Sequence, residues 1–334
     1  MKEAAYYNKL KDKKVQCLIC PRKCIVKEGE YGFCKARKNE KGKFYSVVYA
    51  APCAVNIDPI EKKPLFHFLP GSTVYSVGTT GCNLRCKFCQ NWQISQAMPK
   101  DVPLIDLSPE KIVEEAIANG CSSIAYTYTE PSIFFEYMLD TAKLAKKKGL
   151  KNVFVSNGFI NPEPLKELCK YIDAANIDLK SFSDDFYRKI TGAWLDPVLE
   201  SLKILKQEGV WVEITNLIIP TLNDDMEMIK KMCLWIKGQL GDDTPIHFSR
   251  FFPNYLLKDY SPTGENTLLK AGEIAKKVGL KYVYVGNIEL EKWDNTYCPE
   301  CGGLLVKRRW FEVAENNIKK GRCKCKEKIE GVWE

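Results

Sequence analysis

No stretch of this sequence is long and apolar enough to cross a membrane. A spanning helix takes about 18 or more consecutive apolar residues, and the 334-residue chain has no such run. The N-terminus also lacks the apolar segment of a signal peptide, reading MKEAAYYNKLKDKKVQC. These absences argue against a membrane or secreted protein, and we expect a cytoplasmic one.

Histidine is nearly missing as well, since only His67 and His247 are present, whereas cysteine occurs fifteen times. Metal sites must therefore be built mainly from thiolates, which favour zinc and iron–sulfur over hard cations. In a reducing cytoplasm, so many cysteines are expected to be metal ligands or buried thiols, not disulfides.

The cysteines form three clusters that indicate the domain organisation. Between the first and the third cluster, apolar β-rich segments alternate with helical ones. We predict a Cys-rich accessory module at 1–70, a catalytic domain at 71–293 and a second small module at 294–334. The cysteines of the two outer clusters are Cys17, Cys20, Cys24 and Cys34, and Cys298, Cys301, Cys323 and Cys325.

The alternation predicts an α/β fold with a parallel sheet, because apolar strands separated by helices form right-handed βαβ units. The number of strands suits a full or partial α/β barrel, whose catalytic residues lie just past the C-terminal ends of the strands. The predicted strands are 73–77, 122–130, 152–157, 174–181, 210–220, 245–252 and 281–287. The predicted helices are 108–120, 131–149, 163–172, 196–209, 223–241 and 265–279.

The loop after the first predicted strand, GTTGCNLRCKFCQNW, carries Cys82, Cys86 and Cys89. A structural tetrahedral metal takes four protein ligands, whereas three thiolates can hold a cubane iron–sulfur cluster and leave one iron open for chemistry. The spacing, with aromatic Phe88 before the last cysteine, is the signature of radical S-adenosylmethionine (radical SAM) enzymes. A zinc loop that borrows a distant fourth cysteine is the alternative.

Polar residues follow the other predicted strands. S-adenosylmethionine needs an acceptor for its amino group, donors for its carboxylate and hydrogen bonds to its ribose. Glu130 suits the first role, and we expect the remaining residues to supply the others, unless they only cap helices or line loops. The candidates are Thr129, Glu130, Ser156, Asn157, Asp178, Lys180, His247 and Arg250.

The two outer cysteine clusters have enough thiolates to close a metal site each. The C-terminal pairs, CPEC and CKC, resemble the knuckles of a zinc ribbon, so we interpret them as a structural zinc site, with an accessory iron–sulfur cluster as the alternative. The N-terminal cluster, CLICPRKC followed by GFC, suits zinc and a second iron–sulfur cluster equally.

Several stretches resemble the radical SAM component of the AmmeMemoRadiSam system, a relative of glycyl-radical-enzyme activases such as the pyruvate formate-lyase activase. They include the N-terminal and signature cysteines together with TYTEP, SNGF, IDLKSF and CPECGG. DPIEKKPL (58–65) and HFSRFFPNY (247–255) are more specific to this family than the cysteine spacing.

This resemblance implies a partial (β/α)6 barrel like that of a TIM barrel. It implies that the signature cysteines bind a [4Fe–4S] cluster and that Phe88 lies beside the adenine. Thr129-Glu130-Pro131 stands where activases carry Gly-Gly-Glu-Pro, which binds the amino group, and Asp178 and Lys180 match their Asp-Leu-Lys. Val155 replaces an acidic residue of the activases. A Memo-like protein and an AMMECR-domain protein are the implied partners, and ferredoxin or flavodoxin the expected electron donor.

The sequence therefore predicts a cytoplasmic radical SAM enzyme. Its reduced cluster would cleave S-adenosylmethionine to a 5′-deoxyadenosyl radical, which abstracts hydrogen from a substrate, a protein by resemblance. An RNA-modifying radical SAM enzyme is the alternative that the ribbon-like tail and the net charge of +8 suggest. Since no basic stripe is interleaved with aromatics, we do not expect nucleic acid as a partner. A non-catalytic zinc or iron–sulfur scaffold is the alternative of another class.

Overall fold

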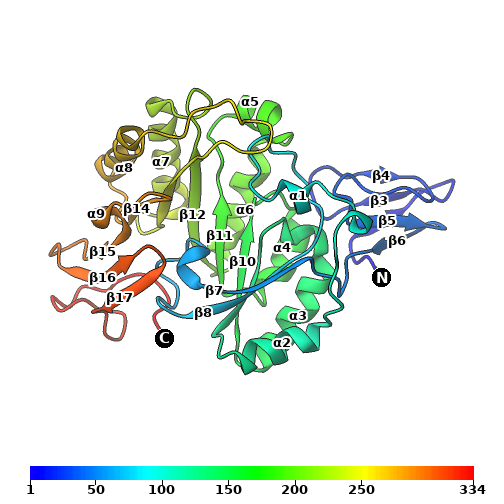
Figure 1. Ribbon diagram of the computed structural model, residues 1–334, viewed down its shortest axis with the longest axis horizontal. Coiled ribbons are helices and arrows are strands. Elements are labelled where there is room, and N and C mark those ends of the chain that lie inside the picture. Colours follow the sequence, from blue (N-terminus) through cyan, green and yellow to red (C-terminus); the bar gives the residue numbers. More distant parts are fainter.

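An eight-stranded sheet forms the centre of the computed structural model, which describes residues Met1–Glu334 (Figure 1). Strands β8 to β14 are parallel and adjacent in sequence order, and β7 pairs antiparallel with β8 at the edge. Because β7 and β14 do not pair, the barrel is open, which confirms the predicted partial α/β barrel. The strands are β7 Ala54–Pro59, β8 Thr73–Gly78, β9 Ser123–Tyr126, β10 Lys151–Ser156, β11 Ala174–Asp178, β12 Trp211–Ile218, β13 Ile246–Arg250 and β14 Val283–Gly286.

Helices connect the parallel strands in the predicted order. The start of α2 shows how the sequence determines where a helix begins. Ser108 accepts a hydrogen bond from the Lys111 N–H (3.4 Å), and a proline follows Ser108 at the first helical position. No helix reaches the length and apolar character that a bilayer-spanning segment requires. The main helices are α2 Pro109–Ala118, α3 Phe135–Lys147, α4 Pro162–Cys169, α6 Asp196–Gln207, α7 Met226–Leu240 and α8 Glu265–Val278.

Two small antiparallel sheets formed by the first 46 residues pack on one side of the barrel (Figure 1). Buried Arg37 joins them to α3 by two hydrogen bonds to the Glu136 carboxylate, of 3.0 and 2.7 Å. Bidentate pairs of this kind fix orientation as well as contact. The strands are β1 Lys2–Glu3, β2 Tyr7–Lys9, β3 Val15–Cys17, β4 Ile25–Val26, β5 Arg37–Glu40 and β6 Lys43–Ser46.

The C-terminal segment forms a third small sheet at the opposite side of the barrel, consisting of β15 Thr296–Tyr297, β16 Leu304–Arg309 and β17 Glu312–Asn316 (Figure 1). Buried Arg308 donates a hydrogen bond to the Phe66 carbonyl (2.7 Å), and the Leu69 N–H donates to the Val332 carbonyl (2.7 Å). The segment between β7 and β8 therefore packs on the C-terminal module. The sequence predicts residues 54–70 as part of the N-terminal module. In the structure, β7 belongs to the barrel sheet, and the segment that follows it packs on the C-terminal module.

Candidate functional site

The signature loop leaves the C-terminal end of β8 and packs against the N-terminal module. Gly81 has φ +94°, and a Cβ atom there would collide with the Cys34 carbonyl oxygen, so only glycine fits. Buried Asn83 holds the loop to the barrel: its Nδ2 donates to the Phe159 carbonyl (2.8 Å), and its Oδ1 accepts from Asn157 Nδ2 (2.9 Å).

The three signature thiols share this loop without converging on one point. Cys86 is buried, and Cys82 and Cys89 are half-buried. Their Sγ atoms are not mutually within 4.8 Å, as the ligands of a single ion would be. Each thiolate of a cubane cluster binds a different iron, so the wider spacing fits a [4Fe–4S] cluster and argues against the zinc loop.

Glu130 links the ends of β9 and β10 beneath this loop. Its buried carboxylate accepts hydrogen bonds from the Ser132 N–H (3.0 Å), Ser156 Oγ (2.8 Å) and the Asn157 N–H (2.9 Å). Burial raises the pKa of Glu130 above its ordinary value. A carboxylate has about four acceptor positions, so most of the capacity of Glu130 already serves to hold Ser156 and Asn157 in place.

Asp178 and Lys180 lie on the other side of the signature loop. Lys180 Nζ is 2.9 Å from Asp178 Oδ2 and 5.6 Å from the centre of the Phe88 ring. Burial alone would lower the pKa of Lys180, but the negative charges of Asp178 and Cys86 raise it overall. A lysine charge is thus held next to the signature cysteines, where it suits an anionic group of a ligand.

Several buried polar atoms near these strand ends have no hydrogen-bond partner. They include Oγ1 of Thr79 and of Thr80, directly after β8, and Oδ1 of Asn216 on β12. Unsatisfied buried polar atoms are rare and costly, so these three oxygens are suited to bind polar groups of a ligand. Among the sequence candidates, Thr129 is already bonded, because its Oγ1 donates to the Thr79 carbonyl (2.8 Å).

Two of the sequence candidates lie outside this group. His247 is the second residue of β13, not its end, and its ring contacts Glu213 (Nε2 to Oε2, 2.7 Å) and packs on Phe66. It therefore belongs to the buried contact between the barrel and the segment before β8. Arg250 does end β13, but its Nε donates to the Thr263 carbonyl (2.9 Å). His247 and Arg250 thus lie at opposite ends of β13, although the sequence analysis grouped them.

The DPIEKKPL stretch forms a buried ionic cluster that the sequence did not reveal. Asp58 accepts hydrogen bonds from Lys62 Nζ (2.8 Å), Lys63 Nζ (2.7 Å) and the Tyr128 hydroxyl (2.6 Å). Tyr128 has φ +66°, a strained conformation for a non-glycine residue. It lies just after β9, which ends at Tyr126, whereas the predicted strand continued to residue 130. Asp58 therefore stabilises the turn that places Thr129 and Glu130.

We expect replacement of Asp58 with asparagine to lower the free energy of unfolding by about 3–5 kcal/mol, because Lys63 would remain buried without its carboxylate. Although burial alone would raise it, hydrogen bonds from Lys62, Lys63 and Tyr128 lower the pKa of Asp58 below its ordinary value of 3.8. The contribution of Asp58 is therefore present above that value and is lost as the pH falls through the lowered pKa.

Denaturant unfolding at several pH values measures both effects. Asp185→Asn is the matched control, since its ion pair with Lys189 is exposed and should change the unfolding free energy by less than about 0.5 kcal/mol. Equal stabilities of the Asp58 and Asp185 variants would contradict the role of the buried cluster.

The C-terminal cysteines form a compact four-thiol site. All four Sγ atoms lie within 4.8 Å of one another, with Cys298 and Cys325 at 3.6 Å and Cys301 and Cys323 at 3.7 Å. Tetrahedral zinc with bonds of about 2.3 Å requires such spacing. The thiols therefore fit one metal ion, in agreement with the zinc-ribbon interpretation.

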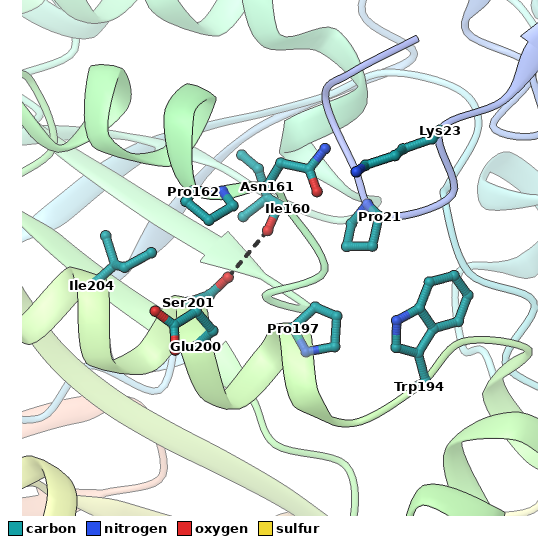
Figure 2. A pocket seen from close by; sticks show the side chains of 10 residues that line it. All are labelled: Pro21, Lys23, Ile160, Asn161, Pro162, Trp194, Pro197, Glu200, Ser201 and Ile204. Carbon is teal, nitrogen blue, oxygen red and sulfur yellow. Dashed lines mark hydrogen bonds between the residues drawn. The ribbon is translucent and has the colours of Figure 1, made fainter. Parts of the chain in front are cut away.

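A cavity of about 320 Å³ lies between the N-terminal module, the start of α4 and α6 (Figure 2). Pro21 and Lys23 of the N-terminal module face α6 across it, and Trp194 borders one side (Figure 2). It contains none of the predicted site residues, so the size of a cavity does not identify the reaction site in this protein.

The chain is similar in sequence to known proteins. The model of the Radical SAM superfamily matches residues 76–233. An uncharacterized protein of Methanocaldococcus jannaschii is 49% identical over 335 residues, covering 99% of this chain and 100% of that protein. The pyruvate formate-lyase-activating enzyme of Clostridium pasteurianum is 27% identical over 167 residues, which cover 47% of this chain and 67% of the enzyme.

The similarity extends to solved structures at the level of the fold. A radical SAM methyltransferase from Sphaerobacter thermophilus aligns with a TM-score of 0.52 and 14% identity over 71% of each chain. The barrel is thus shared at low sequence identity, whereas the signature loop lies in the part of the chain that the superfamily model covers.

Proposed function

We propose that this chain, whose residues 76–233 match the model of the Radical SAM superfamily, acts on a protein substrate by hydrogen abstraction at the C-terminal end of its barrel. When bound, a [4Fe–4S] cluster and S-adenosylmethionine supply a one-electron cleavage that yields a 5′-deoxyadenosyl radical. The observation that carries the proposal is the open spacing of Cys82, Cys86 and Cys89 beside buried charged and unpaired polar groups.

Different residues around the signature loop would bind different groups of S-adenosylmethionine. Lys180 would bind its carboxylate, and the unpaired oxygens of Thr79, Thr80 and Asn216 would bind its polar groups. The carboxylate of Glu130 has capacity for one more donor, such as the amino group, while it orients Asn157. The resemblance assigns Phe88 to the adenine.

A protein is the substrate class that the similarity to activating enzymes supports, because those enzymes act on pyruvate formate-lyase. The resemblance to the AmmeMemoRadiSam system narrows the proposal to an AMMECR-domain or a Memo-like protein as substrate or partner, with a ferredoxin or flavodoxin as electron donor. An RNA-modifying enzyme is the alternative that the experiment below distinguishes from this proposal.

The proposal is tested by incubating the reduced protein anaerobically with S-adenosylmethionine and each candidate protein. We expect 5′-deoxyadenosine release to rise several-fold with the true substrate, whose mass or EPR spectrum should change. Bovine serum albumin and a tRNA pool are the controls. Stimulation by tRNA and by none of the proteins would contradict a protein substrate.

A further inference from the structure

The four N-terminal cysteines, which we call the N-terminal tetrad, surround one small cavity of about 20 Å³. They come from three separate turns: the end of β3, the β3–β4 loop and the turn before β5. The Cys17 N–H donates to the Cys24 carbonyl (2.9 Å), which folds the first loop around the cavity. The members of the tetrad are Cys17, Cys20, Cys24 and Cys34.

The spacing of the tetrad differs from that of the C-terminal zinc-type site in the same protein. The C-terminal thiols lie mutually within 4.8 Å, whereas no three thiols of the tetrad do. The tetrad resembles the signature thiols in this respect. Metal–thiolate bonds of about 2.3 Å are shorter than nonbonded contacts of about 3.5–4.0 Å, so the cavity volume understates the room for a group bonded to its walls.

Positive charge without a carboxylate partner lies beside the tetrad. The guanidinium carbons of half-buried Arg22 and Arg85 lie 3.7 and 3.9 Å from the centre of the Phe33 ring. Neither forms an ion pair with an acidic residue within 4.0 Å. Their hydrogen bonds go to backbone carbonyls, which leave the positive charge unneutralised, so the two guanidinium groups point to an anionic group close by, such as a cluster held by thiolates.

The same residues join the tetrad to the signature loop. Arg22 Nε donates to the Asn83 carbonyl (2.6 Å), and Arg85 donates to the carbonyls of Cys82 (2.8 Å) and Phe33. Asn83 also lines the tetrad cavity. Order in one loop is therefore coupled to order in the other.

We propose that the N-terminal tetrad ligates a second iron–sulfur cluster of the cubane type, packed against the signature loop. All four of its irons would have protein ligands, so this cluster would not bind S-adenosylmethionine. The inference does not depend on the proposed function, because it concerns metal content and not the reaction.

The test is metal analysis and EPR of the full chain, produced anaerobically. Wild-type protein should contain about eight irons and eight sulfides, together with about one zinc. The triple variant Cys82→Ala, Cys86→Ala and Cys89→Ala should keep about four irons and, when reduced, the EPR signal of a cubane. That signal should not change when S-adenosylmethionine is added.

The matched variants separate the two sites. The double variant Cys20→Ser and Cys24→Ser should lose about half of the iron, whereas Cys169→Ser, a buried thiol on α4, should lose none. A folded triple variant without iron would overturn the proposal. If the triple variant does not fold, the wild-type protein decides: about four irons and two zincs per chain would make the tetrad a zinc site.

Discussion

Replacing Cys86 with alanine should abolish both the iron of the signature loop and all release of 5′-deoxyadenosine. Cys86 is 8% exposed and lies between Asn83, which is bonded to the barrel, and Phe88, which is near Lys180. Two remaining thiolates cannot hold a cubane that already lacks its fourth protein ligand. Because the reaction needs the electron that the cluster delivers, the loss should be complete and not a change of affinity.

The measurement is anaerobic iron analysis with quantified 5′-deoxyadenosine, carried out on Cys86→Ala and on Cys169→Ala. Cys169 is equally buried, at 8%, but lies on α4, so its variant should retain activity. Wild-type 5′-deoxyadenosine production by Cys86→Ala would refute the assignment of the signature loop. Parallel loss of activity in both variants would point to unfolding, which circular dichroism would detect.

The second large effect is expected at the C-terminal module. Replacing Cys323 with alanine should release its metal and unfold the module, because structural zinc contributes about 10–16 kcal/mol to the folding of small zinc domains. A small hydrophobic cluster and a few hydrogen bonds, such as that from Arg308 to the Phe66 carbonyl, are the other contacts that hold this module to the barrel. The buried members of the cluster are Phe66, Tyr282, Tyr284, Cys298, Leu305, Val306, Cys323 and Ile329.

Zinc analysis and hydrogen exchange of residues 296–334 measure this loss. Cleavage of S-adenosylmethionine without substrate should persist, because the module packs on the 66–69 segment and not on the signature loop. Lys324→Ala, between the ligand cysteines and exposed, is the control and should keep its zinc. If deletion from Tyr297 left the signature iron intact but ended cleavage, the module would be part of the active site.

The sequence by itself determined the order of the barrel elements and the positions of the thiol clusters. Both are local properties: the α2 start needs only Ser108 and the residues that follow it, and the signature needs only three cysteines on one loop. The polar residues Glu130, Ser156 and Asn157 were also predicted together, because the ends of adjacent parallel strands meet at one edge of a sheet.

The tertiary structure alone decided which distant residues meet and how far apart they stand. Asp58 contacts Tyr128 across seventy positions, and His247 packs on Phe66, which lies far from it in the sequence. The choice between one ion and a cluster depends on sulfur–sulfur distances, which are set by the packing of separate turns. Spacing along the chain does not determine those distances. Four cysteines in similar motifs lie close together in the C-terminal module of this protein and farther apart in the N-terminal module.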